Sequence, residues 1–116
     1  MYNWSWEDFM GTMEKLEKNG IYFNYNDIVY LCKKYRVNEL SVFGSSIRED
    51  FTQHSDVDLL VSFTEDSGIS LFDIMDLENE ISELLEREVD VVEKESLVNP
   101  IRKNKILSTR EIIYAA

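Results

Sequence analysis

Three aspartates occupy positions where the strands of a small globular protein are normally apolar. Asp56 and Asp58 stand at the start of an apolar run that ends at Phe63, and Asp90 interrupts the later run Val-Asp-Val-Val. Side chains two residues apart in a strand point to the same side of the sheet, so the carboxylates of Asp56 and Asp58 converge. Asp90 completes a triad if its strand neighbours that of Asp58. These three residues are the candidate catalytic and metal-binding groups.

Carboxylates gathered in this way predict a divalent cation. Three neighbouring negative charges repel one another, and a cation between them removes that repulsion. Mg²⁺ prefers oxygen ligands and commonly bridges carboxylates to the phosphates of a substrate. Two such ions about 3.5–4 Å apart stabilise both the attacking and the leaving oxygen of an in-line phosphoryl displacement.

A Gly44-Ser45 pair precedes the aspartates and is typical of a phosphate cradle. It ends a predicted strand at residues 39–43 and begins a loop or short helix. Backbone N–H groups at such a start bind phosphate, and glycine has no Cβ to hold the phosphate away. The Ser45 hydroxyl adds another group that can hold a terminal phosphate. Each part alone is a weak signal, but their order, each at a strand end, favours nucleotidyl transfer.

Composition limits the remaining possibilities. A chain of 116 residues has room for one domain, and a net charge of −11 argues against direct nucleic-acid binding. No apolar run approaches the roughly 20 residues of a membrane span, and the N-terminus does not resemble a secretory signal. We therefore expect a cytoplasmic protein without a membrane partner. The basic residues gather near the end: residues 94–110 hold five of them and one acid, Glu95.

The elements that must position these residues alternate along the chain. Helices are predicted from a Ser5 cap to Asn19-Gly20, over residues 26–35, after a Ser70 cap, and from Pro100. Strands are predicted at residues 39–43, 57–63 and 89–92, with a short fourth at 111–114. This order predicts an α/β (α+β) fold, a small sheet of about four strands flanked by helices. It leaves open whether the strands are parallel or mixed.

Four further side chains have ordinary structural interpretations. Cys32 is predicted to lie in the core, and His54 in a solvated loop. Trp4 and Trp6 are either core residues or partner anchors, with the core favoured for Trp6.

The segment LSVFGSSIREDFTQHSDVDLLVSF resembles the signature of the polymerase-beta-like nucleotidyltransferases, which is Gly-Ser, ten residues, then Asp-x-Asp. Here Gly44-Ser45 is followed by ten residues and then by Asp56-Val57-Asp58. Asp90, in EREVDVVEKESL, matches the third acid of that family. The tail LVNPIRKNKILSTREIIY resembles the ending of the minimal nucleotidyltransferase (MNT) branch. The resemblance covers about residues 38–114, the expected catalytic core, and leaves about residues 1–37 as an N-terminal helical extension.

This resemblance implies a nucleotidyltransferase fold with a mixed sheet, binding a nucleotide triphosphate, ATP, with Mg²⁺. It implies that Asp56 and Asp58 ligate two metal ions and that Asp90 ligates one of them and helps deprotonate the incoming hydroxyl. Gly44 and Ser45 would hold the triphosphate; Arg48 matches a recurrent arginine just after the Gly-Ser turn, which we expect to bind nucleotide.

The resemblance also implies a partner. Many MNT proteins are antitoxins encoded beside a HEPN-domain ribonuclease toxin, and some silence that toxin by adding AMP to a tyrosine. We therefore expect an adenylyltransferase antitoxin. Two alternatives stay open: an antitoxin that blocks its toxin by contact alone, and a nucleotidyltransferase acting on a small molecule such as an aminoglycoside.

Overall fold

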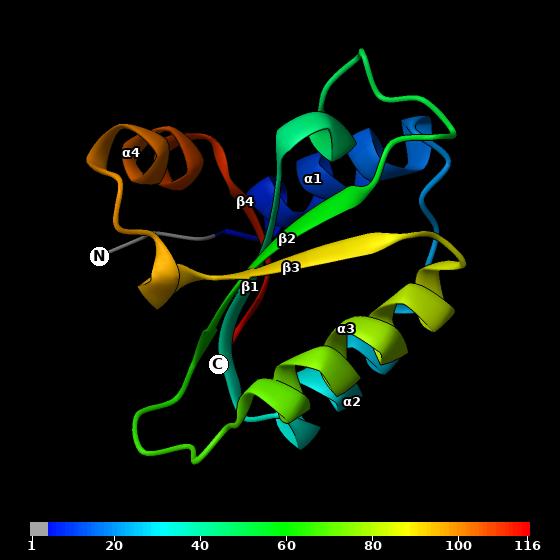
Figure 1. Ribbon diagram of the computed structural model, residues 1–116. Helices are drawn as coiled ribbons and strands as arrows, with labels where there is room; N and C mark the ends of the chain where they lie inside the picture. The colour runs from blue at the N-terminus through cyan, green and yellow to red at the C-terminus, as the bar shows by residue number, and fades with distance from the viewer. Residues whose placement is uncertain (1–4) are drawn as a thin grey trace.

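Four strands form one mixed sheet in the computed structural model, which describes residues 5–116 (Figure 1). The strand order is β3-β2-β1-β4. The central strand β1 runs antiparallel to both of its neighbours, β2 and β4, whereas β2 and β3 are parallel. Their bounds are Val37–Phe43 for β1, Val57–Phe63 for β2, Val89–Glu93 for β3 and Glu111–Ala115 for β4. The predicted fold class is confirmed, and the sheet is mixed.

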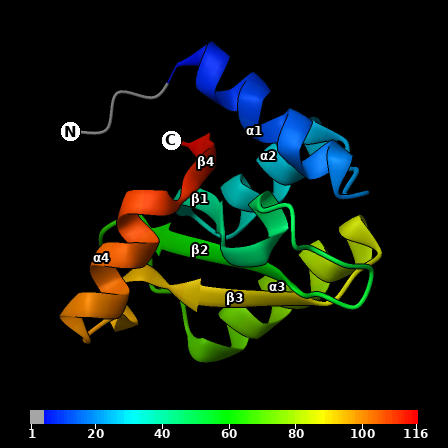
Figure 2. The ribbon, with the colours of Figure 1, turned by 90° about the horizontal axis from the view of Figure 1, so that it is seen from above.

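Helices lie on both sides of this sheet. Helices α2 and α3 run along one side, and α4 lies across the other (Figures 1 and 2). Helix α1 packs beside β4 at the sheet's edge. The bounds are Trp6–Lys18 for α1, Tyr25–Lys34 for α2, Leu71–Leu85 for α3 and Pro100–Thr109 for α4. Within residues 5–116, no helix has the length and apolar character needed to cross a membrane.

The helix starts follow from local capping. Ser5 with Asp8, and Ser70 with Asp73, form reciprocal capping boxes at the starts of α1 and α3. The Asn99 side chain caps α4 directly before its proline. These bonds join residues at most three apart, which is why the sequence alone predicted the starts.

Two side-chain predictions are confirmed and one is wrong. Cys32 is buried and His54 is exposed, as expected. Trp6, expected in the core, is 72% exposed. It is the first residue of α1, and Phe9, one turn later, is the residue that the helix buries; the Trp6 ring lies against the Phe9 ring at its outer side, 5.4 Å between centroids. Trp4 lies outside the described residues.

The two faces of β2 bury different partners. Leu59 and its alternate neighbours join the larger core cluster with α2 and α3, whereas Leu60 packs with Phe43 and with Ile106 of α4. Because strand side chains alternate, Asp58 shares the α4 side of the sheet with Leu60. The candidate site therefore lies on the side of the sheet that α4 covers only in part.

Candidate active site

The strand register places Asp58 beside Asp90. The two residues are direct partners in the parallel β2–β3 pair, and Asp58 is also the partner of Phe43, the last residue of β1. Asp56 directly precedes β2. Asp58 is half-buried, and Asp56 and Asp90 are exposed. The condition on which the triad depended, that the Asp90 strand neighbours the Asp58 strand, is met.

The three carboxylates act on one another. The pKa of Asp58 is raised above its ordinary value, mainly by burial and then by the negative charges of Asp90 and Asp56. The guanidinium groups of Arg48 and Arg102 oppose that rise. In the part of the chain that the structure describes, no three His, Cys, Asp or Glu side chains form a group that could hold a metal ion.

The predicted phosphate cradle, Gly44–Ile47, is a single 3₁₀ turn, here called the Gly-Ser turn. Gly44 has a φ of +70°, and a Cβ at this position would lie 2.5 Å from Oδ2 of Asp58. A residue with a Cβ could take this conformation only if the Asp58 carboxylate moved away. Ser45 is half-buried, and the buried Ser46 hydroxyl donates to the Phe43 carbonyl at 2.9 Å, fastening the turn to the end of β1.

Arg48 follows the Gly-Ser turn and is exposed. Its Nε donates to Oδ1 of Asp50 at 3.0 Å, and this contact holds the pKa of Asp50 below its ordinary value. Arg48 also acts on Asp58, so its charge is felt in the candidate site. The ion pair is solvent-exposed, and such pairs are weak enough to exchange for a phosphate.

Arg102 is a basic residue of the site and one of the five that the sequence gathers within residues 94–110. It lies one turn before Ile106, which α4 buries against the sheet, so the two side chains share a side of the helix. From there its charge acts on Asp58. The available signal was the basic stretch in an otherwise acidic chain.

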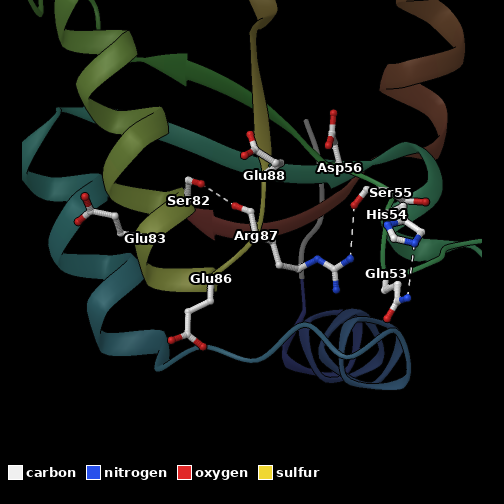
Figure 3. Close-up of a pocket in the computed structure, with 9 residues that line it drawn as sticks. All are labelled: Gln53, His54, Ser55, Asp56, Ser82, Glu83, Glu86, Arg87 and Glu88. Carbon is white, nitrogen blue, oxygen red and sulfur yellow. Dashed lines mark hydrogen bonds between the residues drawn. The ribbon is translucent and has the colours of Figure 1, made fainter.

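Arg87 fastens the loop that leads to Asp56, and the sequence did not single it out. It lies just after α3, and its Nη2 donates to the carbonyls of Thr52 at 3.1 Å and Ser55 at 3.4 Å. Its guanidinium stacks on the Phe51 ring, 4.6 Å from the centroid. Figure 3 shows it reaching toward Ser55 in a hollow of about 620 Å³ that Asp56 also lines.

Comparison with known proteins identifies the family. The model of the nucleotidyltransferase domain matches residues 28–113. The chain is 40% identical over 84 residues to a Methanocaldococcus jannaschii protein assigned as a protein adenylyltransferase, covering 72% of this chain and 82% of that one. It is 39% identical over 84 residues to the protein adenylyltransferase MntA of Thermococcus cleftensis, and the match covers 72% of this chain and 80% of that protein.

Solved structures agree. A structure described as a minimal nucleotidyltransferase is 30% identical with a TM-score of 0.63, covering 74% of this chain and 85% of that chain. Two toxin–antitoxin structures share the fold. One, with AMP-PNP, has a TM-score of 0.64 at 18% identity, covering 80% and 74%. The other, a tri-AMPylated Shewanella oneidensis HEPN toxin with its MNT antitoxin, has 0.57 at 17% identity, covering 79% and 70%. The chain therefore belongs to the minimal nucleotidyltransferase branch of the nucleotidyltransferase family.

Proposed function

We propose that this protein is a Mg²⁺-dependent protein adenylyltransferase that transfers AMP from ATP to a tyrosine hydroxyl of a HEPN-domain toxin and so acts as its antitoxin. The observation that carries the proposal is the pairing of Asp58 with Asp90 in adjacent strands, with the Gly-Ser turn packed against Asp58. In this proposal, residues from about 38 to 114 form the catalytic core of a single nucleotidyltransferase domain, and the residues before them form an N-terminal extension of that domain.

The oxygen donors of the site suit a magnesium ion chemically, although the three carboxylates do not form a three-ligand metal group in this structure. Burial, and then the charges of Asp90 and Asp56, raise the pKa of Asp58, so a cation beside these carboxylates would relieve the repulsion. All three donors are carboxylate oxygens, which Mg²⁺ prefers, and a magnesium site commonly uses one or two carboxylates plus waters and substrate phosphates. Asp56, Asp58 and Asp90 would hold the ions, two of them in our proposal. When bound, the metal would neutralise charge that develops on the phosphates.

The remaining residues would bind and orient the triphosphate. The backbone N–H groups of Gly44 and Ser45 lie at the start of a turn, where such groups can donate hydrogen bonds to an anion. Gly44 has no Cβ, which lets the Asp58 carboxylate lie directly against the turn, and Ser45 is partly accessible. Arg48 and Arg102 add positive charge from two elements, the end of the Gly-Ser turn and α4. Together these groups would place the α-phosphorus beside the aspartates.

Asp90 is the residue that would receive the proton of the acceptor. It is exposed on the edge strand β3, so an incoming hydroxyl can reach it from solvent. In the proposed reaction the tyrosine oxygen attacks the α-phosphorus, the bond to the bridging oxygen breaks, and pyrophosphate leaves. The acceptor proton passes to the Asp90 carboxylate.

The partner proposal draws on two lines of support. Relatives are named protein adenylyltransferases, and the MNT antitoxin with the same fold was solved with a tri-AMPylated HEPN toxin. The net charge of −11 also suits a basic protein partner better than nucleic acid.

The test is transfer of AMP to the product of the neighbouring gene. The protein would be incubated with ATP, Mg²⁺ and that product, and mass spectrometry would locate a tyrosine heavier by one or more AMP groups. The double variant Asp56→Asn, Asp58→Asn should lose the modification. If this variant still neutralises the toxin fully, inhibition occurs by contact alone and the enzymatic proposal is wrong. Modification of a small molecule and not of the protein would refute the assignment of the acceptor.

A further inference from the structure

Helix α1 precedes the stretch that the family model matches, residues 28–113, yet it contacts the candidate site. The contact comes from Asn19, the residue that ends the helix. The Asn19 side-chain amide donates to the carbonyl of Ser46 at 2.8 Å and to the carbonyl of Arg48 at 3.1 Å. A single amide nitrogen carries two hydrogens, so it can make both bonds at once.

The Ser46 carbonyl belongs to the Gly-Ser turn, and Arg48 is the extended residue that directly follows the turn. In a helical turn the carbonyls point toward its end and the N–H groups toward its start. A side chain that holds the carbonyls therefore sets the direction of the N–H groups at Gly44 and Ser45. Among residues 5–116, no side chain caps the start of the turn, so those N–H groups have no side-chain partner there.

Helix α1 is itself fixed to the sheet. Lys15 donates to Oε2 of Glu111 at 2.6 Å, and the buried Thr12 hydroxyl donates to Oε1 of the same carboxylate at 2.9 Å. Glu111 begins β4, which pairs with β1, the strand that leads into the Gly-Ser turn. Leu16 adds an apolar anchor in the core, 1% exposed. Asn19 thus acts from an element that the same sheet holds in place.

We propose that Asn19 is a positioning residue through which the N-terminal helix orients the phosphate-binding turn. This inference rests on the proposed function, because it assigns the N-terminal extension a role in binding Mg-ATP. Asn19 does not touch the nucleotide; it acts through the Ser46 and Arg48 carbonyls.

The experiment compares Asn19→Ala and Asn19→Asp with wild type. Asp has nearly the same size as Asn but directs an oxygen at the two carbonyls, so it tests the donated bonds apart from packing. The matched control is Asn26→Ala, which removes an exposed amide from the first turn of α2. Mg-ATP binding is measured by isothermal titration calorimetry, AMP transfer by steady-state kinetics with the neighbouring gene product, and folding by thermal melting.

We expect both Asn19 variants to weaken Mg-ATP binding and raise its KM about tenfold, equivalent to about 1.4 kcal/mol. The kcat at saturating ATP should stay near that of wild type, and Asn26→Ala should change neither. If Asn19 has only a structural role, its replacement should lower the melting temperature but leave unchanged the Mg-ATP affinity measured at temperatures well below melting.

The two proposals fail in different ways. If wild type binds Mg-ATP and the Asn19 variants bind it equally well, Asn19 has no positioning role, although the proposed function stands. If wild type itself neither binds ATP nor transfers AMP, the proposed function is wrong. Should Asn19→Ala not fold, Asn19→Asp alone decides the matter by the same affinity measurement.

Discussion

Replacing Gly44 with alanine separates the geometry of the site from the stability of the fold. Gly44 has a φ of +70°, where an L-residue costs about 1–2 kcal/mol. The new Cβ would also lie 2.5 Å from Oδ2 of Asp58, whereas real Cβ contacts stay beyond 3.0 Å. The Asp58 oxygen must therefore move by about 0.5 Å or more. It is the end of a side chain, so this movement is cheap in energy but displaces the carboxylate.

Gly68→Ala is the matched control. Gly68 has a φ of +71°, but a Cβ there would meet nothing within 4 Å. Both variants should lose similar stability, about 1–2 kcal/mol, or a fall in melting temperature of about 4–8 °C at a scale of about 4 °C per kcal/mol. Only Gly44→Ala should lose activity. A 1 Å misplacement at a reacting centre can cost about a hundredfold, so a displacement of about 0.5 Å should cost about tenfold.

The assay measures AMP transfer and Mg-ATP binding for both variants well below their melting temperatures. We expect AMP transfer by Gly44→Ala to fall about tenfold or more and that by Gly68→Ala to stay near wild type. If the two variants show equal transfer at equal stability, the packing of the Gly-Ser turn against Asp58 has no catalytic importance, and the geometric argument for the site fails.

Two further predictions test the arginines of the site. Arg102→Gln should raise the KM for ATP about tenfold, because it removes a positive charge that we propose to act on the triphosphate beside Asp58. Lys105→Gln removes a positive charge from the same helix and should change the KM little in the same kinetic assay. Arg87→Met should lower stability by about 1.5–3 kcal/mol, since it removes a charged donor from two carbonyls, and should expose the Thr52–Ser55 loop to proteolysis. Arg87→Lys should be cleaved more slowly in this loop than Arg87→Met. If Arg87→Met is cleaved at the wild-type rate, Arg87 does not hold the loop.

Local signals explain what was predictable in the fold. Helices α1 and α3 begin where the Ser-x-x-Asp patterns of Ser5 and Ser70 predicted, because capping bonds form between residues three apart. The exposure of Trp6 was not predictable in this way. Burial depends on what packs over a side chain, and the helical pattern alone did not distinguish a residue at the helix start from one a turn further in.

The candidate site shows the same division. The spacing of Gly44, Ser45, Asp56 and Asp58 was visible in the sequence because these residues belong to one continuous segment. The hydrogen bonds of Asn19 and Arg87 with that segment, and the effect of the Arg102 charge on Asp58, were not visible, since each joins residues far apart in the chain. Their partners are backbone carbonyls or distant charges, which leave no pattern in the residue types.

The sequence by itself determined the family signature, the helix and strand types, and which aspartates were candidates, because each depends on residues a few positions apart. The tertiary structure alone decided that Asp90 pairs with Asp58 and that the N-terminal helix reaches the Gly-Ser turn. The physical reason is that strand order and register arise from the packing of the whole sheet. A neighbour 32 positions away becomes a contact only when that packing is complete.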